Sequence, residues 1–118
     1  MSFSAALNED ARHVGCFYYK RDQPPLRLVF YNETSRNSPD HCIRTCRWAG
    51  LAYAGLAEGS LCYCDRQLPT FMLPSSHCDK FSCPGDLFEN CGGEDAVDVF
   101  VAGITDEDSQ PSLSLGGF

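Results

Sequence analysis

Eight cysteines in a chain of 118 residues limit the possible folds more than any other feature of this sequence. An even and high number of cysteines in a short chain indicates a framework of disulfides made in an oxidising compartment. The sequon Asn32-Glu33-Thr34 agrees, because N-linked glycans are added only in the secretory pathway. We therefore expect a secreted or cell-surface domain of a larger protein, with Asn32 as an N-glycosylation site.

Zinc is the competing use for so many cysteines. Structural zinc sites usually present pairs of cysteines separated by two to four residues. The close pairs here are Cys-x3-Cys and Cys-x-Cys, no Cys-x2-Cys occurs, and the histidines at positions 13, 41 and 77 have no ligand-like spacing. The acidic residues do not follow an EF-hand-like pattern either. We expect neither a bound metal nor a cofactor.

A helix is predicted over residues 39–49. Ser38 can cap its first turn, Pro39 suits the first helical position, and Asp40 complements the helix dipole. Gly50 is typical of a helix end.

The two close cysteine pairs match the pitch of two different elements. In a helix, Cys42 and Cys46 lie on one face about 6 Å apart. In a strand, Cys62 and Cys64 also lie on one face, about 6.6 Å apart. A helix lying on a sheet could therefore be held by two neighbouring disulfides, each worth about 3 kcal/mol.

The remaining regular structure is expected to be β. Segments rich in β-branched and aromatic residues, or with alternating apolar residues, predict strands. Two of these segments are joined by Glu58-Gly59-Ser60, which predicts a hairpin. The expected strands are 13–19, 26–31, 51–57, 61–64 and 95–101.

Charge and composition restrict the partners and the domain boundaries. Residues 1–50 carry seven basic and five acidic side chains, whereas residues 51–118 carry two and eleven, which gives a net charge of −7. This balance argues against nucleic acid, heparin or anionic membranes as partners. No stretch approaches the roughly 20 apolar residues of a membrane helix, so no direct membrane insertion is expected. Polar composition predicts a flexible lead-in at 1–11 and a flexible tail at 103–118, which leaves one folded domain at 12–102.

The order of short motifs resembles that of the WSC domain, a cysteine-rich extracellular module of yeast cell-wall stress sensors, polycystins and Dickkopf receptors. The resemblance includes all eight cysteines and runs from residue 13 to about 101. Its landmarks are Val-Gly-Cys-Phe at 14–17, Cys-Ile-Arg-Thr-Cys at 42–46, Tyr-Ala-Gly-Leu at 53–56, Cys-Tyr-Cys at 62–64, Cys-Pro-Gly at 83–85 and Glu-Asn-Cys-Gly-Gly at 89–93.

The resemblance implies an α+β fold like that of PAN/apple modules. In this small disulfide-rich domain, one helix packs across a twisted antiparallel sheet. The resemblance also implies four disulfides, of which the middle two are the pair suggested by the helix and strand pitch. The implied pairs are Cys16–Cys78, Cys42–Cys62, Cys46–Cys64 and Cys83–Cys91.

Trp48 is the first candidate for ligand binding. On the expected helix it lies with His41 and Arg44 opposite the cysteines, so that an exposed indole could stack on a sugar ring or anchor a protein. The alternative is a tryptophan that folds over the helix edge onto the sheet. Tyr18 and Tyr19 point to opposite faces of their strand, so we expect one to be exposed and able to extend an aromatic surface.

The apolar loop at residues 68–74, which contains Pro69 and Pro74, is the second candidate. It either covers the sheet or leaves an exposed apolar patch, which usually marks an interaction site. The residues that would form this patch are Leu68, Phe71, Met72 and Leu73.

Three functions are consistent with these features, and none of them is enzymatic. No nucleophile elbow, zinc-hydrolase motif or phosphate-binding glycine loop occurs. The first hypothesis is a monomeric carbohydrate-binding module with a shallow aromatic site. The second is a module that binds an extracellular protein, which is favoured by Ala57-Glu58 where the family usually has Glu and an aromatic residue. The third is a structural spacer.

Overall fold

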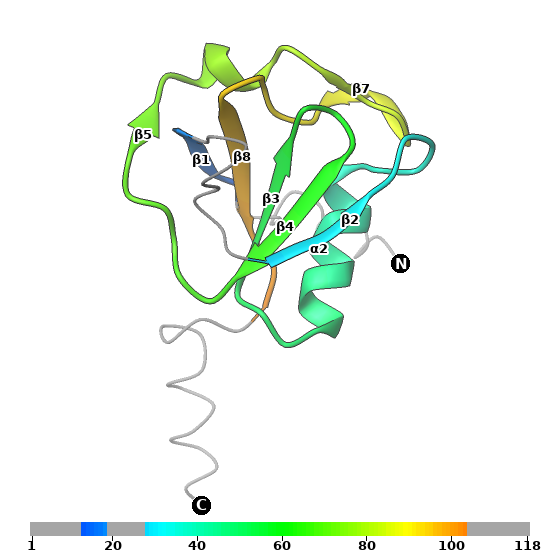
Figure 1. Ribbon diagram of the computed structural model, residues 1–118, viewed down its shortest axis with the longest axis vertical. Helices are drawn as coiled ribbons and strands as arrows, with labels where there is room; N and C mark the ends of the chain where they lie inside the picture. Colours follow the sequence, from blue (N-terminus) through cyan, green and yellow to red (C-terminus); the bar gives the residue numbers. More distant parts are fainter. Residues whose placement is uncertain (1–12, 19–27, 104–118) are drawn as a thin grey trace, which may run out of the picture.

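A six-stranded antiparallel sheet forms the body of the molecule. The structure is a computed structural model that describes residues 13–18 and 28–103. The strand order is β2-β4-β3-β8-β1-β5, and the helix α2 lies on one side of the sheet (Figure 1). The strands of this sheet are β1 (His13–Tyr18), β2 (Leu28–Asn32), β3 (Tyr53–Ala57), β4 (Leu61–Asp65), β5 (Met72–Leu73) and β8 (Ala96–Val101).

The helix α2 (Pro39–Trp48) begins where its sequence predicts and ends one residue early. The Ser38 hydroxyl oxygen accepts a hydrogen bond from the His41 backbone N–H at 3.1 Å, which caps the first turn. After the last turn the chain reverses at Gly50, which has a φ of 80° and donates its N–H to the Arg47 carbonyl at 2.9 Å. A left-handed conformation of this kind favours glycine.

The predicted hairpin is also present. Strands β3 and β4 are joined by residues 58–60, with Leu56 opposite Cys62 and Ala57 opposite Leu61. Because side chains alternate along a strand, Cys62 and Cys64 face the helix while Leu61 and Tyr63 pack on the other side of the sheet.

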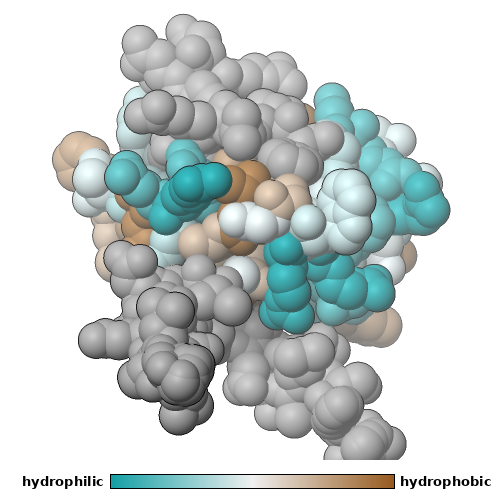
Figure 2. Space-filling view, turned by 90° about the horizontal axis from the view of Figure 1, so that it is seen from below, coloured by the Kyte–Doolittle hydropathy of each residue, from teal (hydrophilic) through white to brown (hydrophobic). Residues whose placement is uncertain are grey.

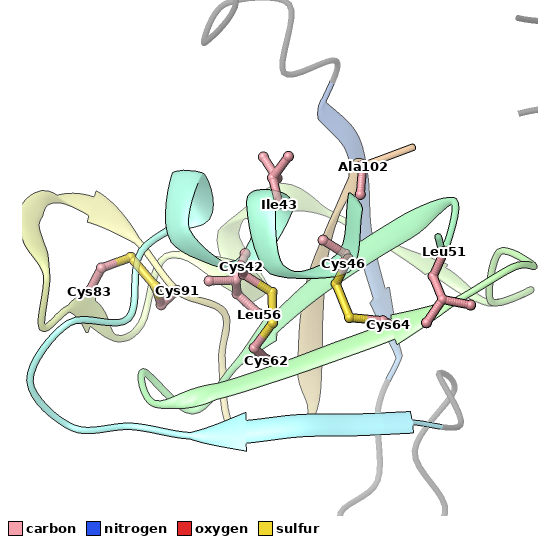
Figure 3. Close-up of a cluster of buried hydrophobic side chains, with 11 residues drawn as sticks. Cys42, Ile43, Cys46, Leu51, Leu56, Cys62, Cys64, Cys83, Cys91 and Ala102 are labelled. Carbon is pink, nitrogen blue, oxygen red and sulfur yellow. A yellow bond between two sulfur atoms is a disulfide. The ribbon is translucent and has the colours of Figure 1, made fainter. Parts of the chain in front are cut away.

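The two close cysteine pairs lie between helix and sheet. The disulfides Cys42–Cys62 and Cys46–Cys64 join α2 to β4 one after the other, with Cα–Cα distances of 5.7 and 5.5 Å. Figure 3 shows them beside the apolar side chains Ile43, Leu51 and Leu56. The other two disulfides are Cys16–Cys78 and Cys83–Cys91, so all four expected pairings are confirmed.

Several short elements between β4 and β8 had no counterpart in the sequence prediction. A single 3-10 turn, η1 (Ser75–Cys78), carries Cys78 to its partner in β1. A small separate sheet follows, made of β6 (Ser82–Cys83) and β7 (Asp86–Asn90) and closed by Cys83–Cys91. Gly92 allows this hairpin to pack closely against the main sheet, because any side chain at this position would collide with the Leu56 carbonyl.

A buried asparagine joins several segments that are far apart in the sequence. Asn37 is fully buried, and its side-chain oxygen accepts a hydrogen bond from the Tyr31 hydroxyl at 2.6 Å. Its side-chain N–H donates to the Gly59 carbonyl at 2.7 Å, and its backbone carbonyl accepts from the Gly85 N–H at 2.8 Å. Strand β2, the helix entry, the β3–β4 turn and the β6–β7 hairpin therefore meet at one residue.

Candidate functional site

Trp48 stands on the last turn of α2 and is 87% exposed. The helix places it outward because Cys42 and Cys46 are bound to the sheet on the opposite face. The indole does not fold over the helix edge, so the alternative position in the sequence prediction is not adopted. A large aromatic side chain left in water at an ordered position is a typical anchor for a ligand.

Polar side chains accompany the indole along the same helix face. Arg44 lies one turn before Trp48 and forms an ion pair with Asp40 at 3.0 Å, in which both side chains are half exposed or more. An exposed ion pair of this kind contributes about 0–1 kcal/mol, so either group can exchange its partner for a ligand at little cost. A shallow depression is lined by His41, Arg44, Thr45 and Trp48.

His41 lines this depression and lies next to side chains of β2 and of the loop that follows it. Its ring lies 5.2 Å from the Tyr31 ring, and its Nε2 lies 3.8 Å from a carboxylate oxygen of Glu33. The Thr45 hydroxyl donates to the His41 backbone carbonyl at 2.9 Å. Burial and the charge of Glu33 both raise the pKa of the Tyr31 phenol, so this hydroxyl stays protonated and keeps donating to Asn37.

The turn that carries Trp48 is held firmly. The Arg47 side chain donates from Nε to the Ala102 carbonyl at 2.6 Å, which ties the helix end to the chain just after β8. The Leu51 N–H donates to the Cys46 carbonyl at 3.0 Å, and Cys46 is itself bound to β4. Seen from below, the described surface at this end is a mixture of hydrophilic and hydrophobic residues (Figure 2). A fixed surface of mixed polarity loses little entropy when it binds.

The second candidate surface lies at the edge of the sheet formed by β5. Phe71 and Met72 are 69% and 59% exposed, and the Tyr18 ring lies 6.3 Å from the Phe71 ring in an edge-on arrangement. The Tyr18 N–H donates to the Phe71 carbonyl at 2.8 Å. Leu68 is also exposed.

Leu73 differs from the other residues of this loop. It packs against the cluster formed by Cys16, Cys78 and Ala96 and is half-buried. Leu73 is therefore the residue of this loop that packs into a buried cluster, whereas Leu68, Phe71 and Met72 remain largely exposed.

The structure thus divides the expected binding residues into two groups. His41, Arg44 and Trp48 share one face of α2. Tyr18 lies instead with the loop residues on β1 and β5, on the opposite side of the molecule in Figure 1. Tyr19 lies outside the described residues.

A third exposed apolar group was missed by sequence reasoning. Leu87 and Phe88 on β7 are 71% and 98% exposed. The available signal was the segment Asp-Leu-Phe-Glu at 86–89 inside the Cys83–Cys91 loop, which closes over a separation of only eight residues. So short a loop has no interior in which two large side chains could be buried.

Metal binding has one geometric candidate among the described residues. The Sγ atoms of Cys42, Cys46 and Cys62 lie within 4.8 Å of one another. All three sulfurs belong to disulfides and carry no thiolate, which is the form that binds metals. In the same described ranges, no helix has the length and hydrophobicity needed to cross a bilayer.

Comparison with known proteins agrees with this architecture. The family model for the WSC domain matches residues 13–93. The xylosyltransferase sqv-6 of Caenorhabditis briggsae is 34% identical over 90 residues, which are 75% of this chain and 11% of that protein. Cell wall integrity and stress response component 2 of Saccharomyces cerevisiae is 31% identical over 101 residues, which are 82% of this chain and 19% of that protein.

An animal protein gives a similar match. Kremen protein 1 of Xenopus laevis is 32% identical over 92 residues, which are 75% of this chain and 20% of that protein. The chain therefore spans between about a tenth and a fifth of the length of these three relatives.

Proposed function

The chain belongs to the WSC domain family, and from that premise we propose that residues 12–102 form an extracellular, non-catalytic module that binds carbohydrate through the outer face of α2. The match to the xylosyltransferase covers only about a tenth of that enzyme, which favours an accessory role for this module. A shallow and open depression also suits binding better than catalysis, because enzymes usually enclose their substrates.

The exposure of Trp48 carries this proposal. The flat face of an indole can cover the apolar C–H face of a pyranose ring, which removes apolar area of both partners from water. Arg44 and Asp40 lie one and two turns away on the same face and supply hydrogen-bond donors and acceptors for sugar hydroxyls. Thr45 and His41 complete the polar lining.

The charges around Trp48 favour an uncharged sugar over a polyanion. Arg44 is already paired with Asp40, and Arg36 donates to the Glu33 carboxylate at 3.1 Å. The face therefore carries little net positive charge, and the chain as a whole carries −7. A sulfated or uronic acid chain would meet long-range repulsion that a neutral glycan avoids.

A glycan array probed with the oxidised monomeric domain tests the proposal. We expect binding to one class of neutral oligosaccharide, at least tenfold weaker in Trp48→Ala, which corresponds to about 1.4 kcal/mol. Phe71→Ala is the matched control, because it removes another exposed aromatic ring, next to β5 and away from α2. Arg44→Ala should also weaken binding, whereas Arg66→Ala, an exposed arginine after β4, should not. A blank array with folded protein, or binding unchanged in Trp48→Ala, would refute the proposal.

Protein recognition is the second candidate, and the exposed Phe71 and Met72 favour it. Together with Tyr18 and Leu68 they form an apolar patch that a partner could cover. A microarray of secreted proteins separates the two functions. Binding that is lost in the double variant Phe71→Ser/Met72→Ser and retained in Trp48→Ala would favour the protein partner.

A further inference from the structure

The β6–β7 hairpin presents two large apolar side chains to solvent on a rigid support. Leu87 and Phe88 are 71% and 98% exposed, so they gain little of the stabilisation that burial of an apolar side chain provides. The hairpin itself is well fixed. Cys83–Cys91 closes it, the Phe81 carbonyl accepts from the Cys91 N–H at 2.8 Å, and the Asp86 carboxylate accepts from the Phe88 N–H at 3.2 Å.

The segment that contains these side chains is strongly acidic. Residues 77–96 contain five exposed acidic side chains and a single lysine, Lys80. A depression beside the hairpin is lined by the Phe81 ring, by Glu94 and Asp95, and by His77 and Lys80. The five acidic residues are Asp79, Asp86, Glu89, Glu94 and Asp95.

These features occupy one end of the molecule. In Figure 1 the segment from η1 to β7 runs along the top, while the last turn of α2 lies towards the bottom. The backbone links Phe81 N–H to the Gly92 carbonyl at 3.2 Å and Gly93 N–H to the Ala96 carbonyl at 2.9 Å, which fixes the acidic strand ends beside the hairpin. The exposed apolar side chains and the acidic residues therefore lie at the same end of the molecule, and we call this region the hairpin surface (Phe81, Leu87 and Phe88 with the five acidic residues).

We propose that the hairpin surface docks a basic segment of another protein, with an apolar side chain of that segment covering Phe88. Arginine or lysine side chains beside that anchor pair with Glu94, Asp95 and Glu89. Interfaces commonly combine a central apolar anchor with complementary charges at the rim. Nucleic acid and anionic lipid carry the wrong charge for this surface, and a symmetric pair of copies would set two acidic rims against each other.

This site is independent of the proposed carbohydrate site. It uses none of the residues around Trp48 and lies at the other end of the module. The two proposals can therefore fail separately.

Selection from a random peptide display library against the oxidised domain tests the proposal. We expect the enriched peptides to combine arginine or lysine with a large apolar residue. Their affinity should fall at least tenfold in Phe88→Ser and in Glu94→Lys/Asp95→Lys, and should weaken as salt is raised. Phe71→Ser and Trp48→Ala are matched controls that should leave binding unchanged.

Folding of each variant is checked by near-ultraviolet circular dichroism and by the absence of free thiols. Because every substituted side chain is on the surface, all variants should pass. No enriched peptides, acidic peptides, or peptides that bind Phe88→Ser as tightly as the parent would overturn the proposal. So would a concentration-dependent dimer of the isolated domain that Phe88→Ser abolishes, because a second copy would then be the occupant.

Discussion

Two disulfides join α2 to β4, and removal of one of them should cost less stability while the other is intact than after the other has been removed. Cys42–Cys62 and Cys46–Cys64 close overlapping loops with sequence separations of 20 and 18. While Cys42–Cys62 is intact, Cys46–Cys64 closes only a small additional ring, made of about four residues of helix and two of strand. The entropy lost by the unfolded chain grows with the size of the ring that a disulfide closes.

The magnitudes follow from these ring sizes. A ring of about six residues corresponds to about 2 kcal/mol, whereas the loop of 20 residues closed by Cys42–Cys62 alone corresponds to about 3 kcal/mol. Removal of either disulfide should therefore cost about 2 kcal/mol and removal of both about 5.5 kcal/mol, beyond the effect of the alanine side chains themselves. Cys16–Cys78 closes a ring of about 42 residues through the Cys42–Cys62 link and should cost about 4 kcal/mol.

Urea unfolding of oxidised variants measures these differences. The variants replace both cysteines of a bridge by alanine, so that each bridge carries the same change in side chains. Far-ultraviolet circular dichroism is the suitable signal, because Trp48 is exposed in the folded state and its emission changes little on unfolding. We expect loss of Cys16–Cys78 to exceed loss of one helix bridge by about 2 kcal/mol.

Two results would refute this reasoning. One is an equal cost for Cys16–Cys78 and for a single helix bridge. The other is a cost for the two helix bridges together that equals the sum of their separate costs, because ring overlap predicts an excess of about 1 kcal/mol.

Three further predictions concern buried and surface polar groups. Asn37→Ala should lower the free energy of unfolding by about 2 kcal/mol, measured by urea unfolding, because it leaves the buried Gly59 carbonyl and the partly buried Tyr31 hydroxyl without their partner. The hydrogen bond from His13 to Asp98, at 2.6 Å, and the negative charge of Asp98 raise the pKa of His13 above 6.5 although burial opposes this. The stabilisation by protonated His13 is therefore fully present below pH 6.5 and is lost as the pH rises through the higher pKa of the folded state. The melting temperature should fall between pH 6 and pH 8 in the parent domain and in the control His77→Asn. It should fall much less in His13→Asn. Asn32 is exposed at the end of β2, so the domain secreted from eukaryotic cells should lose mass on treatment with a peptide N-glycosidase, and Asn32→Gln should show no such loss.

Local signals allowed the helix and its contacts to be predicted. The helix ends could be predicted because the residues that define them, Ser38, Pro39 and Gly50, act on backbone groups next to them in the sequence. Once the helix is placed, its period sets the outward direction of Arg44 and Trp48 and the inward direction of the cysteines. The face that carries the candidate carbohydrate site was therefore accessible to sequence reasoning.

The unpredicted parts depend on distant residues. Strand β5 has only two residues and exists because β1 provides its hydrogen-bonding partner. The segment that forms β7 contains Asp86 and Asn90, which are uncommon in strands, and it is shaped by a disulfide and by Gly92. Asn37 has no sequence signal at all, because its partners come from a strand and two separate turns.

The place where the chain enters and leaves the sheet determines how this module would bear load. His13 at the start of β1 lies opposite Phe100 near the end of β8, so both connections to the rest of the protein emerge side by side. Tension applied at the start of β1 and the end of β8 would separate these two strands progressively, breaking one pair of hydrogen bonds at a time. No disulfide joins β8 to another strand, since its residues follow the last cysteine. A load applied at the two described ends of the chain would therefore act on neighbouring strands rather than along the length of the sheet.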